Sequence, residues 1–424
     1  MNPLTDRILK RALDGERLSL EEGEALFHAK DLTALGFVAD SLRRKHHPEP
    51  VVTYVVDRNI NYTNVCVSGC LFCAFHRRPT DPDAYVLSRE ELFAKIEELA
   101  SLGGTQILMQ GGLHPGLRLD YYCEMLRSIK EHFAIRIHAF SPPEIVHFAR
   151  LEGITITEVL RRLQEAGLDT IPGGGAELLV QKVRDRISPR KCTADDWLSV
   201  MRGAHNMGIR TTATMMFGHV ESPEDRIEHL RRVRELQDET GGFTAFIPWT
   251  FQPRLGANLS PATGECPHPS RLPAGEERCR GAPCGLPFGR GQAPPLHEDG
   301  AIVEGWGEGR DSMRCPEDPK TDLPPRPAGG HDYLKTLAIC RTFLDNFSNI
   351  QASWVTQGAK VAQVALRFGA NDLGSTMIEE NVVRAAGTQF CMTVGEIRRV
   401  IEEAGFKPVQ RDCYYEPVES VGER

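Results

Sequence analysis

Short apolar runs alternate with amphipathic stretches along most of the chain. Runs rich in β-branched and aromatic residues predict strands at 51–56, 105–110, 134–140, 168–172, 210–216, 243–249 and 350–355. Apolar residues that recur every three to four positions predict helices at 89–102, 121–133, 157–166, 194–207, 223–239, 333–343, 357–368 and 395–404. After a longer first interval, strand starts up to position 243 recur about every 29 to 42 residues, the length of a strand–helix unit.

This repeat predicts an α/β fold, in which parallel strands form a barrel and the helices lie outside it. An open, doubly wound sheet is the alternative, but no G-x-G-x-x-G motif follows the first predicted strand. Residues 1–50 are expected to form an N-terminal helical segment. Within it, Ser19 and Glu22 have the spacing of a capping box.

One long segment interrupts the repeat. Residues 254–330 contain 13 Pro and 13 Gly among 77 positions and no sustained periodicity. Such a composition buries too little apolar area to offset the entropy lost when the chain becomes ordered. We therefore predict a flexible insertion at 254–330, between barrel parts at 51–253 and 331–416, and a tail at 417–424.

A cysteine triplet follows the first predicted strand. Cys66, Cys70 and Cys73 lie close together, and Gly69 lets the backbone curl between them. Three thiolates on one loop suit zinc or an iron–sulfur cluster, whereas hard ions prefer oxygen ligands. A fully ligated 4Fe–4S cluster usually takes four cysteines, so three leave one iron open, as in a catalytic centre. A structural zinc with a distant fourth ligand, or three thiols without a metal, is the simpler alternative.

The triplet resembles the signature of the radical S-adenosylmethionine (SAM) enzymes, C-x-x-x-C-x-Φ-C, in which Phe72 is the aromatic residue. The resemblance implies a full or partial (β/α) barrel, a 4Fe–4S cluster on the three cysteines, and SAM at the open iron. It also implies that one electron from the cluster splits SAM into methionine and a 5′-deoxyadenosyl radical. A protein electron donor such as flavodoxin or ferredoxin is then expected.

Further segments resemble the futalosine-pathway enzymes of menaquinone biosynthesis. They are NINYTNVC at 59–66, CAF at 73–75, QGGLHP at 110–115, PGGGAE at 172–177, TTATMMFGH at 211–219, GGFTAFIPWTFQP at 241–253 and EEN at 379–381. The resemblance implies a radical cyclase that abstracts hydrogen from the ribose-like ring of dehypoxanthine futalosine and joins that carbon to the benzoate ring. The sister enzyme aminofutalosine synthase is the alternative. A non-catalytic iron–sulfur or zinc-binding protein is a third interpretation.

Two glycine-rich loops are candidates for binding SAM. Gln110, Gly111 and Gly112 follow a predicted strand, which is where barrels place their sites, and the resemblance implies that this loop receives the amino group of SAM. Glu177 follows the glycines at 173–175 and could bind ribose hydroxyls or the methionine amino group. Tight turns without a ligand would explain the same residues.

No catalytic side chain stands out in the sequence. His114, His138 and His219 each lie at or just beyond the end of a predicted strand. One of them could hold the substrate carboxylate or move the proton that is lost when the ring becomes aromatic again. Each alone is explained as simply by packing or by a loop.

Composition narrows the class of protein. The net charge of −8 argues against a nucleic-acid partner, and no apolar run approaches the roughly 18 residues of a membrane helix. Residues 1–11 are charged and lack the apolar core of a secretory signal. Twelve cysteines are too few for a disulfide scaffold of this length. We expect a cytoplasmic enzyme that acts on a small molecule.

Overall fold

The computed structural model describes residues 3–252, 328–385 and 391–418. The predicted insertion at 254–330 therefore lies outside the described residues, apart from its last three positions. So does most of the predicted tail at 417–424. Within the described residues no helix is long and apolar enough to cross a membrane.

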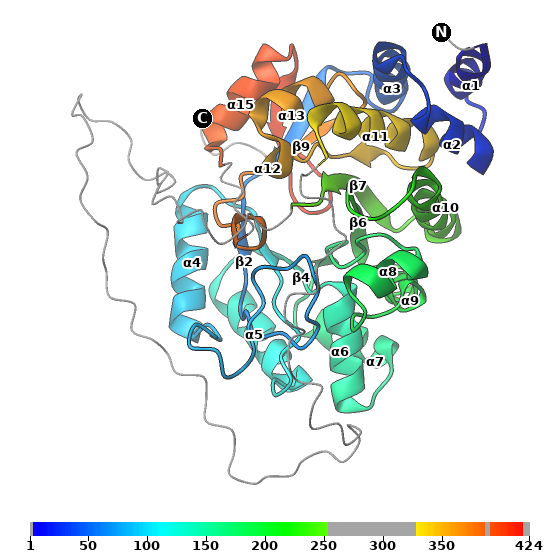
Figure 1. The fold of residues 1–424 in the computed structure, drawn as a ribbon. Coiled ribbons are helices and arrows are strands. Elements are labelled where there is room, and N and C mark those ends of the chain that lie inside the picture. The colour runs from blue at the N-terminus through cyan, green and yellow to red at the C-terminus, as the bar shows by residue number, and fades with distance from the viewer. Residues whose placement is uncertain (1–2, 253–327, 386–390, 419–424) are drawn as a thin grey trace, which may run out of the picture.

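Three helices precede the first strand: α1 (Pro3–Leu13), α2 (Leu20–Phe27) and α3 (Leu32–His46). The predicted capping box is present, because Ser19 accepts from the amide of Glu22 and the Glu22 carboxylate accepts from the amide of Ser19. These helices pack against α10 (Pro223–Thr240) and α11 (Gly330–Phe343) and cover one side of the barrel, as Figure 1 shows.

All the strands in the described part of the chain pair in parallel. Seven of them, β2 to β8, follow one another in chain order in one sheet, and β10, β1 and β9 form a second sheet. Their bounds are β1 Val51–Val55, β2 Asp57–Ile60, β3 Gln106–Met109, β4 Arg136–Ala139, β5 Thr170–Ile171, β6 Arg210–Phe217, β7 Phe243–Thr250, β8 Asn349–Ile350, β9 Asp372–Ser375 and β10 Lys407–Gln410.

The two sheets join into a ring at a strand that changes partners. The carbonyl of Val55, at the end of β1, accepts from the amide of Thr376 beside β9 at 3.0 Å, whereas the carbonyl of Val56 accepts from Thr105 beside β3 at 3.2 Å. A parallel bridge between Gln351 and Asp372 links β8 to β9. The pairing therefore returns to its start, and the predicted barrel is confirmed.

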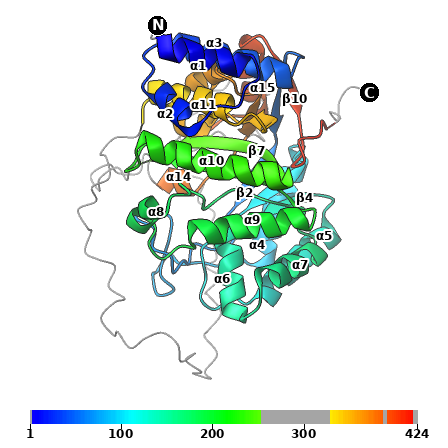
Figure 2. The same cartoon turned by 90° about the vertical axis from the view of Figure 1, so that its right-hand side faces the viewer.

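The remaining helices lie outside the strands. Figure 2 shows α10, α9 and α6 one after another along one side of the molecule. Their bounds are α4 Arg89–Ser101, α5 Leu119–His132, α6 Pro142–Glu152, α7 Ile156–Glu165, α8 Gln181–Ile187, α9 Ala194–Asn206, α12 Trp354–Gln357, α13 Ala359–Ala365, α14 Val382–Ala385 and α15 Val394–Glu403.

The last part of the barrel differs from the prediction. The strand predicted at 350–355 is wrong beyond its first residues, because β8 ends at Ile350 and α12 begins at Trp354. The amide of Ser353 donates to the hydroxyl of Tyr333 at 2.6 Å and is therefore taken out of the strand ladder. The helix predicted at 357–368 is shorter in the structure, because α13 runs from Ala359 to Ala365 and Gly358, whose φ of 78° is not helical, separates it from α12.

Two buried histidines, His138 and His229, predict a fold that is sensitive to acid. Nδ1 of His229 accepts from the amide of Leu179 at 2.9 Å, so protonation would remove this acceptor. Burial lowers the pKa of His229 to about 3, and burial also lowers the pKa of His138 to about 3. Since both values lie below the usual 6.5, the stability that these groups contribute is present above pH 6.5 and is lost as the pH falls toward 3.

We expect the thermal midpoint of the holoprotein to fall between pH 6.5 and pH 5. His229 alone should account for about 1.5 kcal/mol of the lost stability. The measurement is anaerobic melting over this range for the natural chain and for His229→Gln, whose amide oxygen can still accept from Leu179. The variant should show a shallower pH slope. Equal slopes would refute this account of the acid sensitivity.

Candidate active site

A cavity of about 390 Å³ occupies the inside of the barrel. Alternate residues of the strands face it, because successive side chains of a strand point to opposite sides. On β2 these include Asp57 and Asn59, on β3 Gln106 and Leu108, and on β6 Thr212 and Thr214. The interior is therefore rich in amide and hydroxyl groups, which suits a ligand with several polar substituents.

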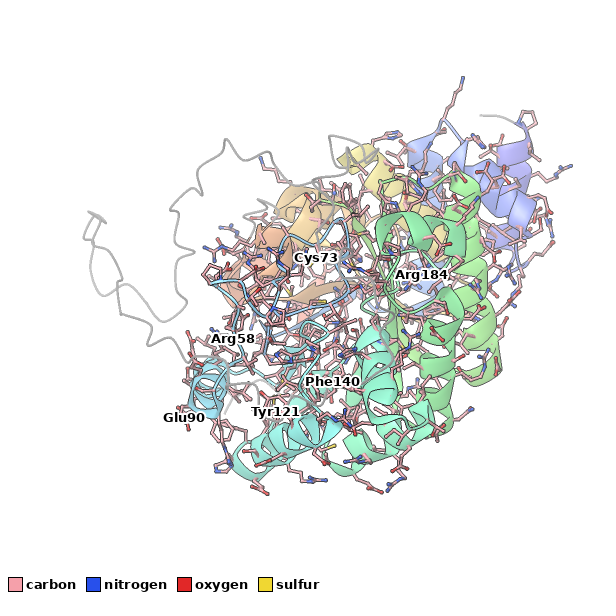
Figure 3. All side chains as sticks on the ribbon, turned by 60° about the horizontal axis from the view of Figure 1, so that its bottom comes forward. Arg58, Cys73, Glu90, Tyr121, Phe140 and Arg184 are labelled. Carbon is pink, nitrogen blue, oxygen red and sulfur yellow. The ribbon has the colours of Figure 1, made fainter. Side chains whose placement is uncertain are left out.

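The three predicted cysteines line one end of this cavity. They lie on the loop that joins β2 to α4, beyond the carboxyl end of β2, and Figure 3 shows Cys73 on this loop. The amide of Cys66 donates to the carbonyl of Arg77 at 2.9 Å, and the Ser68 hydroxyl lies 3.2 Å from Sγ of Cys70. All three thiols are free of disulfides.

The thiols fit an iron–sulfur cluster better than a single ion. Among the described residues, the one group of three His, Cys, Asp or Glu ligand atoms within 4.8 Å of one another is Glu24, His28 and Glu224 on the surface. At least one pair of the three sulfurs therefore lies more than 4.8 Å apart, beyond the roughly 4 Å between two thiolates on one tetrahedral zinc. Burial raises the pKa of Cys66, and it raises the pKa of Cys70 to about 11, so the thiols would lose protons when a metal binds.

The predicted glycine loop lies against the cysteine loop. A side-chain carbon on Gly112 would be 2.1 Å from the carbonyl oxygen of Val65, and one on Gly111 would lie 2.4 Å from the ring of Tyr62. Gln110, Gly111 and Gly112 all line the cavity beside the cysteines. Only glycine allows this close approach, which brings backbone groups to the edge of the cavity.

A buried carboxylate holds this glycine loop. Glu144, on α6, accepts from the Gly111 amide at 3.0 Å and from the Tyr62 hydroxyl at 2.5 Å. It lines the cavity, and burial raises its pKa despite these hydrogen bonds. Sequence reasoning missed Glu144, because it lies on a helix whose pattern was not assigned and 33 positions from Gly111.

The second glycine loop brings Glu177 to the cavity. Glu177 is buried, has a φ of 40°, and accepts from Nζ of Lys191 at 2.5 Å. The same ammonium lies 5.6 Å from the centre of the Phe72 ring, so Phe72, Glu177 and Lys191 form one group beside the cysteines. Lys191 was not predicted, since it follows a helix and a loop with no motif of their own.

The three candidate histidines do not lie together at one site. His138 on β4 lines the cavity, and its Nδ1 lies 2.7 Å from the hydroxyl of Thr170. His114 and His219 do not line this cavity, and their candidate roles stay predictions. Nδ1 of His114 accepts from the amides of Gly116 and Leu117, which makes it part of a turn.

His219 is likewise a structural residue. Its side chain is fully buried, Nδ1 lies 3.1 Å from the carboxylate of Glu221, and Nε2 lies 3.1 Å from the carbonyl of Met216. Both ring nitrogens are therefore used within the loop that follows β6. The position of His219 at the end of a strand therefore did not predict the direction in which its ring points.

The other end of the cavity carries polar groups that the sequence did not indicate. Asp57 accepts from the Ser375 hydroxyl and from Nε2 of Gln106, and burial raises its pKa to about 6. Arg411 pairs with the buried carboxylate of Asp372 at 2.6 Å. Cys413 and Tyr415, which follow Arg411, also line this end.

Two sequence families match the chain. The model described as the Radical SAM superfamily matches residues 60–233, and the model described as the CofH/MqnC C-terminal region matches residues 325–423. The first covers the cysteine loop and strands β3 to β6. The second covers β8 to β10 and, at the far end of the cavity, Ser375, Arg411, Cys413 and Tyr415.

Several curated proteins are similar over nearly their whole length. The cyclic dehypoxanthine futalosine synthase of Halalkalibacterium halodurans is 42% identical over 97% of this chain and 94% of its own. A 5-amino-6-(D-ribitylamino)uracil–L-tyrosine 4-hydroxyphenyl transferase of Methanopyrus kandleri is 40% identical over 87% and 84%. The aminodeoxyfutalosine synthase of Thermus thermophilus is 35% identical over 97% and 95%.

The fold also has a counterpart among solved structures. The crystal structure of a methylornithine synthase superposes with a TM-score of 0.62 and covers 95% of this chain and 97% of its own. At 16% identity this similarity concerns the fold alone.

Proposed function

The chain belongs to the radical SAM superfamily, and from that premise we propose that it converts dehypoxanthine futalosine to cyclic dehypoxanthine futalosine in menaquinone biosynthesis. The observation that carries the proposal is the meeting of three cysteines from one loop, none of them in a disulfide, with a cavity inside the barrel that amide and hydroxyl side chains help to line. The 42% identity to a cyclase of that name over nearly both chains supports the choice of substrate.

Cys66, Cys70 and Cys73 would hold the 4Fe–4S cluster. When bound, the reduced cluster and SAM supply a 5′-deoxyadenosyl radical. We assign the loop of Gln110 to Gly112 and the group of Phe72 and Glu177 to SAM, because they lie at the cysteine end of the cavity. This leaves the rest of the cavity for the substrate, shielded from water by the surrounding strands.

When the ring becomes aromatic again it gives up one electron, which a bound, oxidised cluster would take back, and one proton, which needs an acceptor in the protein. His138 faces the cavity, but its pKa of about 3 makes it a weak base at neutral pH. Asp57 faces the same cavity with a pKa of about 6, which is better matched to this task. We therefore favour Asp57 as the residue that takes the proton and His138 as a hydrogen-bonding residue for the substrate.

The alternatives rest on weaker observations. Aminodeoxyfutalosine synthase activity has the support of a 35% identical relative, below the 42% of the cyclase. A non-catalytic zinc protein does not account for the cavity beside the three cysteines. A soluble electron carrier, a cytoplasmic location and the absence of a nucleic-acid partner stay predictions.

The proposal is tested by product analysis. The protein is reconstituted anaerobically with iron and sulfide, then given dithionite, SAM and dehypoxanthine futalosine. We expect a cyclic product two hydrogens lighter than the substrate, with one 5′-deoxyadenosine per turnover, by mass spectrometry. SAM cleavage without a cyclic product would refute the substrate, and the enolpyruvyl benzoate substrate of the sister enzyme would be tried next. No cleavage by a protein with an intact cluster would refute the radical chemistry.

A further inference from the structure

Two amide side chains inside the barrel each have an oxygen without a hydrogen-bond partner. Asn59 on β2 is 4% exposed and Gln106 on β3 is 3% exposed, and both line the cavity. Neither Oδ1 of Asn59 nor Oε1 of Gln106 accepts a hydrogen bond from the described part of the chain. Because a buried polar atom without a partner costs free energy, the two oxygens indicate a place where a ligand donates hydrogen bonds.

The nitrogens of the same amides determine which way the oxygens face. Nδ2 of Asn59 donates to the carboxylate of Glu380 at 2.8 Å, and Nε2 of Gln106 donates to that of Asp57 at 2.9 Å. Since an ionised carboxylate only accepts, each amide must turn its N–H groups toward it and its oxygen away. Asp57 pairs with Gln106 in the register of β2 and β3, and Asn59 shares the face of Asp57, so the two amides are neighbours.

Arg411 brings unused donors to the same end of the cavity. It is 4% exposed and lines the cavity. Of its five N–H groups, two donate to Asp372 and one donates to the carbonyl of Asp412, which leaves one N–H on each terminal nitrogen without an acceptor among the described residues. Burial raises the pKa of Asp57 to about 6, whereas its hydrogen bonds and the charge of Arg411 lower it. The donors of Arg411 therefore lie close to Asp57 and Gln106.

Tyr415 adds a hydroxyl that can donate or accept. The centre of its ring lies 3.7 Å from Cζ of Arg411, and its buried hydroxyl has no partner within the described ranges. Its φ of 66° is strained for a residue with a side chain, and such strain is typical of places where a side chain has to be held in one position. Unpartnered buried groups elsewhere, such as the amide oxygen of Asn346, belong to residues that do not line the cavity.

The mixture of donors and acceptors indicates which kind of group fits this end of the cavity. A hydroxyl donates one hydrogen bond and accepts others, so neighbouring hydroxyls of one sugar ring can serve the two amide oxygens and the two N–H groups together. A carboxylate only accepts, so it would leave both amide oxygens without a partner. It would also lie beside the carboxylates of Asp57 and Asp372, which disfavours a further negative charge. This end therefore suits a sugar better than a benzoate.

We propose that Asn59, Gln106 and Arg411 bind the ring hydroxyls of the substrate's sugar and so determine which end of the substrate lies at the far end of the cavity. The inference rests on the proposed function and deepens it, because the hydroxyl-bearing ring is that of dehypoxanthine futalosine. The proposed reaction joins a carbon of this ring to the benzoate ring. A sugar held here therefore also keeps the ring carbon that loses its proton near Asp57.

The test compares the affinity for the substrate with that for analogues that lack its 2′- or its 3′-hydroxyl. Binding is measured anaerobically by calorimetry, without a reductant, on the cluster-loaded natural chain and on Gln106→Met and Asn59→Leu. For the natural chain, we expect at least one deoxy analogue to bind about tenfold or more weakly, because a buried group is then left unpaired. At least one variant should lose a similar factor for the substrate and should distinguish it from that analogue by less than about twofold.

Asn346→Ala supplies the control, since Asn346 also has an unpartnered amide oxygen but does not line the cavity. It should distinguish substrate from analogue as the natural chain does. A substrate analogue whose carboxylate is replaced by an amide should be distinguished equally by all four proteins, because the carboxylate lies away from these residues.

Three results would overturn the assignment alone, in a natural chain that cyclises the substrate. They are equal affinity of the natural chain for the substrate and both deoxy analogues, undiminished discrimination in both cavity variants, and variants that change the discrimination between carboxylate and amide instead. The first of these needs no variant, so it decides the question even if a variant fails to fold. A natural chain that neither binds nor converts the substrate would overturn the proposed function and this assignment together.

Discussion

Replacement of Cys66 by serine is expected to abolish cluster binding and SAM cleavage. Cys66 is one of only three thiols on its loop, and the others cannot replace it because a cluster with an open iron already uses all three. Iron content should fall to background, and 5′-deoxyadenosine formation should fall about a thousandfold or more. The measurements are iron analysis, the visible spectrum of the reconstituted protein and chromatography of deoxyadenosine.

A matched control separates ligation from the general loss of a thiol. Cys391 is exposed and lies outside the cavity, so Cys391→Ser should keep the iron content and the activity of the natural chain. If Cys66→Ser also kept both, the assignment of this loop to the cluster would be wrong. Loss in both variants would point to an effect of thiol chemistry during reconstitution.

Replacement of Gly112 by alanine is expected to have nearly as large an effect on the cluster. The added carbon would lie 2.1 Å from the carbonyl oxygen of Val65 and 2.9 Å from Cβ of Cys66. The first of these atoms belongs to the backbone and cannot turn away, so the cysteine loop itself must move. We expect a loss of stability of about 1–3 kcal/mol and a cluster content well below half of normal, measured by melting and iron analysis.

Gly116 offers the control in the same loop. A side-chain carbon on Gly116 would meet nothing closer than 3.5 Å, which is an ordinary contact with the ring of His114. Gly116→Ala should therefore bind iron and melt like the natural chain. Normal cluster content in Gly112→Ala would show that the two loops do not pack as closely as described.

The barrel and the cysteine loop could be predicted from the sequence, because the patterns that indicate them each lie within a short stretch of chain. A strand–helix unit repeats within about 40 residues, and the triplet lies within one loop. Strands β9 and β10 were missed, since DLGS and KPVQ contain glycine, proline and charge and only one β-branched residue, Val409. Their extended form comes from pairing with β1 on either side, which no local pattern records.

The far end of the cavity could not be predicted from the sequence either, because its residues come from distant parts of the chain. Asp57 meets Ser375, and Arg411 meets Asp372, although the first pair is 318 positions apart. Each residue alone reads as an ordinary turn or strand residue. The positions of His114 and His219 at strand ends could be predicted, but the hydrogen bonds of their rings to backbone groups nearby could not.

The pairing of β1 with a strand near the end of the chain also determines when the barrel can close during synthesis. Thr53 pairs with Asp372, more than 300 residues further along the chain, so the ring stays open until β9 leaves the ribosome. At roughly 5–20 residues per second, β1 waits about 15 to 65 seconds for that partner. During this time the pocket that would shelter the metal is incomplete. We therefore expect iron and sulfide to be delivered after translation, to a finished and closed chain.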